Sequence, residues 1–284
     1  MKNNLEKTTI ELTIQQLKQL RLIELDIMDE IDRICKNNNI KYSLSGGTLL
    51  GAVRHGGFIP WDDDIDIMMM RNDYDRFCRI ASESDSSHFC LVNAYNDKYF
   101  GHTFSKMMAK DTFMEEMVTS STQTPKGVFV DIFPIDYANS SEKRNIDSFK
   151  KMRRISRNLL CRGNYYFGQS GIRLLLYRIN GVLLRLIPKS FFLEKMDAIV
   201  ENRDPNPKVL SLSGTYNYEK EIHDTSIFNE YQYIAFEDRK YMAIKQADMF
   251  LTDAYGDYMK LPPKEKQIPH HFVVGIDLEQ YWRK

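Results

Sequence analysis

The sequence predicts an α+β fold in which helices flank a mixed β-sheet. Long segments with apolar residues at helical spacing are interspersed with short apolar runs that are typical of strands. The chain has 284 residues, of which 43% are hydrophobic, so it can bury a substantial core as one large domain or two small ones. We expect residues 1–138 to form the core domain. Residues 139–284 should form a mainly helical, basic region whose C-terminal segment packs back on that core.

The first predicted element is a long amphipathic helix. Thr13 and Gln16 match a capping box, in which the two residues satisfy each other's backbone N–H groups. Apolar residues then recur at helical spacing as far as residue 34, and the pattern ends near residues 36–39. We interpret the apolar face as core and assign the charged residues to the opposite, solvated face.

A glycine pair, Gly46 and Gly47, separates a short predicted strand at residues 41–45 from a helix that we expect to begin at Thr48. Glycine lets the backbone turn tightly and approach a ligand closely. Free N–H groups and the dipole at a helix N-terminus favour anions. We therefore expect Ser45 and the three residues after it to cradle a phosphate, although a glycine pair alone is more often a simple turn.

Three aspartates follow at alternating positions, Asp62, Asp64 and Asp66. Alternate residues of a strand face the same side, so a strand that extends back through the acids would bring these carboxylates together. Such carboxylates repel each other unless a cation lies between them. Oxygen ligands favour Mg²⁺, one ion or two, with Mn²⁺ as an alternative. The competing interpretation is a solvated acidic loop.

Another acid, Asp131, interrupts the apolar strand predicted over residues 128–133. Burying an isolated carboxylate without a partner is costly. We therefore expect Asp131 to join Asp62, Asp64 and Asp66 at the metal site or to act as a base. The alternative is an edge-strand acid that faces water. Asp136, just after Pro134, is assigned to a turn.

Five basic residues are candidates for contacting a phosphorylated ligand: Arg54, His55, Lys106, His270 and His271. The first two follow the helix of the cradle, and arginine can grip phosphate with two hydrogen bonds. The lysine lies on the first arm of a hairpin predicted over residues 102–109 and 112–118. The adjacent histidines lack the spacing of zinc ligands. The structural alternatives are cations at a helix C-terminus and an exposed strand lysine.

The net charge of zero conceals an asymmetry, because residues 148–193 contain ten basic residues and no acid. They fall on helices predicted over residues 141–160 and 171–187, the second of which has a broad apolar face edged by arginines. We favour a core helix whose arginines keep their charged ends in water. The alternative is a helix that lies in the interface of an anionic membrane.

The remaining composition predicts a cytoplasmic protein. The sequence has no run of about 18 apolar residues that would span a membrane, and its N-terminus lacks the apolar core of a signal peptide. The four cysteines have no metal-binding spacing and are expected to be free and reduced. The zero net charge argues against binding of nucleic acid.

Two strings, GGTLLGAVRHGGFIPWDDDIDI and the later YGDYMKLPP with its two following histidines, resemble the LicD family of phosphorylcholine transferases. Fukutin-related proteins are also similar to that family, and the resemblance spans roughly residues 20–272. The family belongs to the nucleotidyltransferase superfamily. Its pattern of a glycine turn, an acid–apolar–acid strand and a later acid falls here on Gly46-Gly47, Asp64-Ile65-Asp66 and Asp131.

The resemblance implies transfer of phosphocholine from CDP-choline, or of the phospho-alcohol of CDP-ribitol or CDP-glycerol, with Mg²⁺ as cofactor and release of CMP. The acceptor would be a sugar hydroxyl of a polysaccharide or of a lipid-linked, teichoic-acid-type precursor. Docking of residues 148–193 on an anionic membrane would bring the protein close to such an acceptor. Two other functions stay open: nucleotidyl transfer to a small hydroxylated substrate, and a non-catalytic, anion-binding accessory role.

Overall fold

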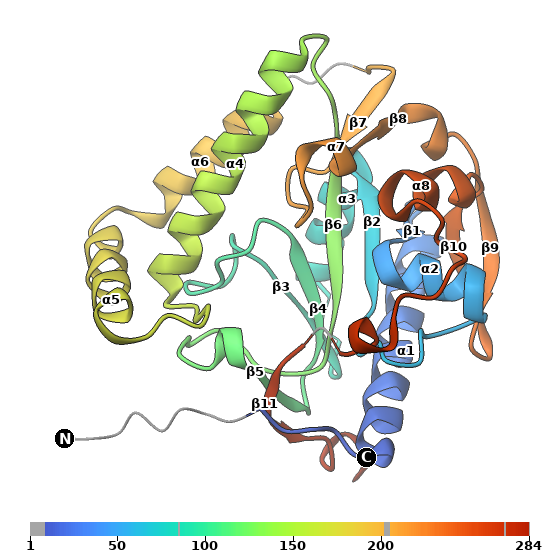
Figure 1. Cartoon of the computed structure of the whole chain (residues 1–284), viewed down its shortest axis with the longest axis horizontal. Coiled ribbons are helices and arrows are strands. Elements are labelled where there is room, and N and C mark those ends of the chain that lie inside the picture. The colour runs from blue at the N-terminus through green and yellow to red at the C-terminus, as the bar shows by residue number, and fades with distance from the viewer. Residues whose placement is uncertain (1–8, 85, 202–204, 270, 284) are drawn as a thin grey trace.

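A mixed sheet of seven strands, with the central order β1-β2-β6-β4-β3, organises the chain (Figure 1). The computed structural model describes residues 9–84, 86–201, 205–269 and 271–283. β2 and β6 are parallel neighbours, and the other pairs in the sheet are antiparallel. The predicted α+β class is confirmed. The strands are β1 (Ser43–Leu44), β2 (Asp66–Met70), β3 (Phe89–Val92), β4 (Ser105–Ala109), β6 (Phe129–Tyr137), β7 (Lys208–Leu210) and β8 (Ile222–Asp224).

Helix α1 packs its apolar stripe against the sheet, in contact with β4 and β6. It begins at the predicted capping box, in which Thr13 and Gln16 satisfy each other's backbone N–H groups. Two charged residues depart from the predicted solvated face, because Glu24 is only 1% exposed and Asp32 only 7%. The helices around this half of the chain are α1 (Ile14–Asn37), α2 (Gly46–His55), α3 (Arg71–Ser82), α7 (Tyr218–Glu221) and α8 (Ala247–Tyr255).

The hairpin predicted over residues 102–118 is wrong, because β5 (Phe113–Glu116) does not pair with β4. β4 is already hydrogen-bonded to β3 on one side and to β6 on the other, so it has no free edge. β5 instead pairs with the C-terminal strand β11 (Val273–Asp277). This pairing carries the end of the chain back to the sheet. A separate hairpin joins β9 (Tyr231–Phe236) and β10 (Arg239–Ile244).

The turn assignment for Asp136 is also wrong. This residue lies within β6, is 1% exposed and pairs with Arg71 at 2.7 Å. The guanidinium donates to both carboxylate oxygens of Asp136, and Arg71 opens α3 directly after β2. The ion pair therefore ties together the ends of the two parallel strands whose beginnings carry Asp66 and Asp131.

Three helices, α4 (Glu142–Gly163), α5 (Gly171–Arg185) and α6 (Lys189–Val200), form a unit beside the sheet (Figure 1). α4 and α6 share a second, smaller apolar core that includes Phe149, Met152 and Phe192. α5 crosses the end of α4, where Gly181 lies against the Cys161 carbonyl.

The apolar face of α5 is exposed, so our interpretation of it as a core helix is wrong. The seven side chains of this face, which follow one another at helical spacing, are 47% to 79% exposed: Ile172, Leu175, Leu176, Ile179, Val182, Leu183 and Leu186. In α5, the residue that is buried is Gly181. Among the described residues, no helix has both the length and the apolar character that crossing a bilayer requires.

Candidate active site

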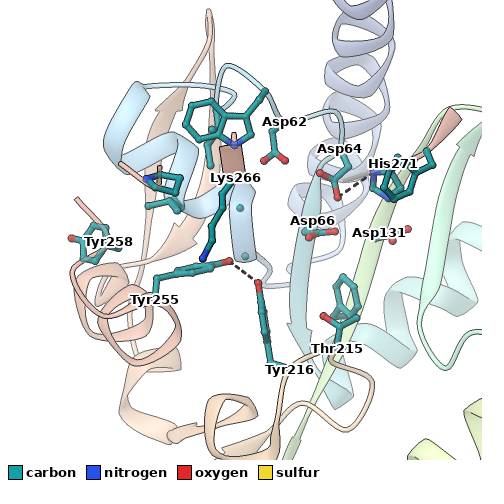
Figure 2. A pocket seen from close by; sticks show the side chains of 18 of the residues that line it. Asp62, Asp64, Asp66, Asp131, Thr215, Tyr216, Tyr255, Tyr258, Lys266 and His271 are labelled. Carbon is teal, nitrogen blue, oxygen red and sulfur yellow. Dashed lines mark hydrogen bonds and ion pairs between the residues drawn. The ribbon is translucent and has the colours of Figure 1, made fainter. Parts of the chain in front are cut away.

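Asp66 and Asp131 lie directly opposite each other at the starts of the parallel strands β2 and β6. Both line a cavity of about 850 Å³, together with Asp62 and Asp64 (Figure 2). The strand does not extend back through the acids as predicted, because β2 begins at Asp66 and the preceding acids occupy a loop. The alternation nevertheless holds for the cavity, since Asp63, which contacts the His271 ring at 3.3 Å, is not among the residues that line it.

Two residues from other elements fix the acidic loop and Asp66. Arg21 of α1 donates hydrogen bonds to the carbonyl oxygens of Ile59, Pro60 and Asp62. The hydroxyl of Thr48 accepts a hydrogen bond from the backbone N–H of Asp66 at 2.8 Å. Thr48 is buried and does not line the cavity, so its side chain positions Asp66 instead of facing a phosphate.

The glycine turn lies directly against the acids. α2 begins at Gly46, two residues earlier than predicted, with Ser45 as its N-cap. A Cβ atom at Gly47 would lie 2.8 Å from Oδ2 of Asp62, and one at Gly46, where φ is +50°, would lie 3.3 Å from Oδ2 of Asp66. Both glycines line the cavity. Larger residues would therefore push on the carboxylates and fill the space beside them.

Burial, followed by mutual repulsion, weakens the acidity of the cluster. These causes raise the pKa of Asp62 to about 8 and raise the pKa of Asp66 well above its usual value. Burial also raises the pKa of Asp131 to about 6, although the charge of Lys106 opposes the shift. Two buried carboxylate oxygens, Oδ1 of Asp131 and Oε2 of Glu24, have no hydrogen-bond partner within the described residues. A divalent cation would offset both the burial and the repulsion, because it favours the ionised carboxylates that can serve as its oxygen ligands.

Two cationic side chains already lie among the acids. Nζ of Lys106 is 3.2 Å from Oδ1 of Asp131, without hydrogen-bonding geometry, and 3.9 Å from Glu116. The His271 ring lies 3.3 Å from Asp63, 3.6 Å from Glu116 and 4.0 Å from Asp64. Burial opposes its charged form, but the hydrogen bond to Asp63 and the nearby acids raise the pKa of His271 well above its usual value.

The residues whose ligand atoms lie close enough together to hold a metal ion differ from the predicted set. In the described part of the chain, Asp63, Asp64 and His271 are the group whose ligand atoms lie within 4.8 Å of one another. This group shares Asp64 with the predicted set of Asp62, Asp64, Asp66 and Asp131. His270, which we also expected to contact phosphate, lies outside the described residues.

The other predicted phosphate contacts divide between the cavity and the surface. Arg54 lines the cavity and donates to the carbonyl oxygen of Tyr258 at 2.7 Å. His55 is exposed, packs edge-on against Trp61 and is not among the residues that line the cavity. Ser45 is likewise outside the lining. The cavity therefore brings Arg54, Lys106 and His271 together and leaves His55 out.

Sequence reasoning missed several residues that the structure places here. Tyr216 and Tyr255 face the acids across the cavity, with hydroxyl oxygens 3.4 Å apart, and Lys266 extends towards Tyr255 (Figure 2). Tyr255 and Lys266 belong to a string whose resemblance to the family could have indicated a site role. The sequence did not indicate a site role for Glu24, because this residue follows the same spacing as the solvated charged residues of its helix.

The fold and the site together define a nucleotidyltransferase-type domain, with a glycine turn facing acids on neighbouring parallel strands. The family profile described as "LicD/FKTN/FKRP, nucleotidyltransferase domain" matches residues 39–160. The chain is 33% identical over 260 residues to the lipopolysaccharide cholinephosphotransferase LicD of Haemophilus influenzae, an alignment that covers 90% of this chain and 96% of that protein. It is 27% identical over 120 residues to the human ribitol 5-phosphate transferase FKRP, covering 35% of this chain and 24% of FKRP. The chain therefore belongs to the LicD family, and it is a phosphotransferase.

Proposed function

We propose that the chain transfers phosphocholine from CDP-choline to a sugar hydroxyl of a cell-surface glycan precursor, with release of CMP. The name of the Haemophilus relative supports choline as the alcohol. The observation that carries the proposal is the pairing of Asp66 with Asp131 beside the glycine turn. Transfer of phosphoribitol from CDP-ribitol is the second candidate, because the human relative is named a ribitol 5-phosphate transferase.

The aromatic wall of the cavity favours choline over ribitol. Trp61, Tyr216 and Tyr255 line the cavity, and the two tyrosines lie across it from the acids (Figure 2). Aromatic faces attract quaternary ammonium groups, by about 0.5–2 kcal/mol for each contact. Ribitol carries hydroxyl groups and no charge, so it would gain nothing comparable from these rings.

The acid cluster fits a divalent cation. We assign Asp64, Asp66 and Asp131, with Asp62 beside them, as the residues that would hold Mg²⁺, and Oδ1 of Asp131, which has no hydrogen-bond partner among the described residues, supports this assignment. When bound, Mg²⁺ would neutralise the diphosphate of the donor. The backbone of Gly46 and Gly47 leaves room for the phosphate oxygens. A position between Asp63, Asp64 and His271 is the alternative.

Lys266 and Arg54 line the cavity and supply positive charge towards the donor. In the proposed reaction, the acceptor oxygen attacks the phosphorus that bears choline. A new phosphorus–oxygen bond forms, and the bond from that phosphorus to the bridging oxygen of CMP breaks. The hydroxyl proton passes to a carboxylate, for which Asp131 is our candidate. The protein's contribution is mainly to position the reactants and stabilise charge.

A thermal-shift comparison of CDP-choline, CDP-ribitol and CDP-glycerol, each with and without Mg²⁺, tests this function. Ligand at 100 times its Kd should stabilise the protein by about 2.7 kcal/mol, and we expect the largest Mg²⁺-dependent shift with CDP-choline. The released nucleotide is then identified by chromatography. Release of the free phospho-alcohol with CMP joined to the acceptor, which is nucleotidyl transfer, would contradict the proposal, as would a larger shift with CDP-ribitol.

We also propose that residues 148–193 contact an anionic membrane. The exposed apolar face of α5 and the absence of acids from this block support the contact. An apolar helix face flanked by arginines binds at the boundary between lipid headgroups and acyl chains, and anionic lipids strengthen the binding.

A further inference from the structure

A second cavity adjoins the catalytic cavity, between α4 and the loop that leads into α7. Its volume is about 1200 Å³. Four residues line both cavities: His102, Phe104, Phe167 and Thr215. A ligand that lies in the second cavity can therefore extend past these residues to the catalytic acids.

Four basic side chains of α4 line this second cavity, which we call the basic groove: Lys150, Arg153, Arg154 and Arg157. Their spacing of three and four residues places them on one face of the helix. Glu219 is the one acid among the described lining residues. The side chains of the groove thus carry a net positive charge.

Three of these basic residues have no side-chain partner among the residues that the structure describes. Arg153 is engaged, because its guanidinium donates to the carbonyl oxygens of Gly214 and Tyr216. Lys150, Arg154 and Arg157 are exposed, and within the described part of the chain they make no ion pair or hydrogen bond through their side chains. Like charges on one helix face repel each other, and a bound anion would relieve that repulsion.

We propose that the basic groove binds the acceptor, and that the acceptor carries phosphate. Guanidinium groups match phosphate oxygens with paired hydrogen bonds, which suits Arg154 and Arg157. The donor's own diphosphate has a different place, beside the glycine turn and the acids, none of which lines the groove. The inference rests on the proposed function, because that reaction has two substrates and the donor takes the first cavity.

The phosphate of such an acceptor can belong to a diphosphate link to a lipid carrier or to the glycan itself. Two soluble probes represent these sources: inorganic pyrophosphate and glucose 1-phosphate. Binding is measured by calorimetry without divalent cations, because the acid cluster then repels anions and the groove alone should respond. Uncharged glucose serves as the blank. Tighter binding of pyrophosphate assigns the groove to the diphosphate link, and tighter binding of glucose 1-phosphate assigns it to the glycan.

The test variant is Arg154→Gln combined with Arg157→Gln, and its matched control is Arg173→Gln combined with Arg178→Gln on α5. All four arginines are exposed, so both variants should fold, which a melting curve verifies. We expect phosphate probes to bind the test variant about tenfold or more weakly, in line with the loss of charge-assisted hydrogen bonds. The control variant should bind like the unmodified protein.

Binding of CDP-choline with Mg²⁺ is measured in parallel and should be unchanged in both variants. No binding of either phosphate probe to the unmodified protein would overturn the proposal, as would an equal loss in the two variants. Failure of CDP-choline to bind would instead count against the proposed donor, while the probe measurements would still report on the groove.

Discussion

The sheet half of the chain and the helices α4 to α6 differ in whether their charged side chains are buried or exposed. In the sheet half, Asp66, Asp131 and Lys106 are held close together and largely removed from water. In the helical unit, basic residues such as Arg154 and apolar residues such as Leu176 are both exposed. Buried charges must find partners within the protein or in a bound ligand, whereas exposed ones are available to a separate molecule. We therefore assign the chemistry to the first region and the contacts with acceptor and membrane to the second.

The largest effect is expected from Asp66→Asn in the sheet half. Loss of this carboxylate should lower turnover by about 10²–10³-fold, as removal of one group that stabilises transition-state charge typically does. The fold should persist and its melting temperature should hold or rise, because burial and repulsion already disfavour the charged form of Asp66. Transfer to an acceptor and thermal melting are measured together. Asp147→Asn, an exposed position on α4, is the control; normal turnover by Asp66→Asn would refute the site.

In the helical unit, the strongest test replaces Leu176 and Leu183 of α5 with serine. Each buried leucine contributes about 1.5–3 kcal/mol, so sedimentation with anionic vesicles should fall by about tenfold or more. Melting should barely change, because both side chains are more than half exposed. Ile268→Ser, an equally exposed apolar position outside residues 148–193, is the control. Equal vesicle binding by all proteins would remove the membrane contact, and a dimer lost only in the double variant would assign the face to a second copy.

The two regions also differ in how much the sequence could predict. The pairing of Asp66 with the acid of a distant strand was predictable, because an isolated carboxylate in an apolar strand requires a nearby partner. The exposure of α5 was not, because its spacing and composition suit a core helix equally well. Whether an apolar face is covered depends on the packing of α4 and α6, which local sequence does not encode. The pairing of β5 with β11 depends likewise on the absence of a free edge on β4.

A smaller effect is expected at Thr48, which connects the glycine turn to Asp66. Thr48→Val removes the hydroxyl that accepts the Asp66 N–H and leaves that partly buried donor unsatisfied. We expect a loss of about 1–3 kcal/mol in the free energy of unfolding and a fall in kcat of about tenfold, because Asp66 loses its fixed position. Thr48→Ser keeps the hydroxyl and should therefore retain most of the unfolding free energy and most of the kcat. If valine and serine variants behave alike, the hydrogen bond does not position Asp66.

The last expected effect concerns stability and not turnover, and it tests whether a buried carboxyl outside the acid cluster also costs stability when charged. Glu221 of α7 is buried and accepts a hydrogen bond from the Tyr216 N–H at 2.7 Å, in the loop that adjoins both cavities. Burial raises the pKa of Glu221 from 4.5 to about 7. The folded state therefore holds this proton more tightly than the unfolded state. The resulting stabilisation is complete below pH 4.5 and is lost as the pH rises through about 7.

Glu221→Gln keeps the acceptor oxygen but cannot ionise, so it isolates this contribution from that of the acid cluster. Between pH 5 and 8 the unmodified protein should lose up to about 3 kcal/mol more of its unfolding free energy than the variant does. Urea denaturation at four pH values in this range measures the difference, with the exposed Glu219→Gln as control. If the unfolding free energies of Glu221→Gln and the unmodified protein change in parallel with pH, burial does not disfavour the charged form of the Glu221 carboxyl. The cost of buried charge would then be confined to the acids on β2, β6 and the loop before them.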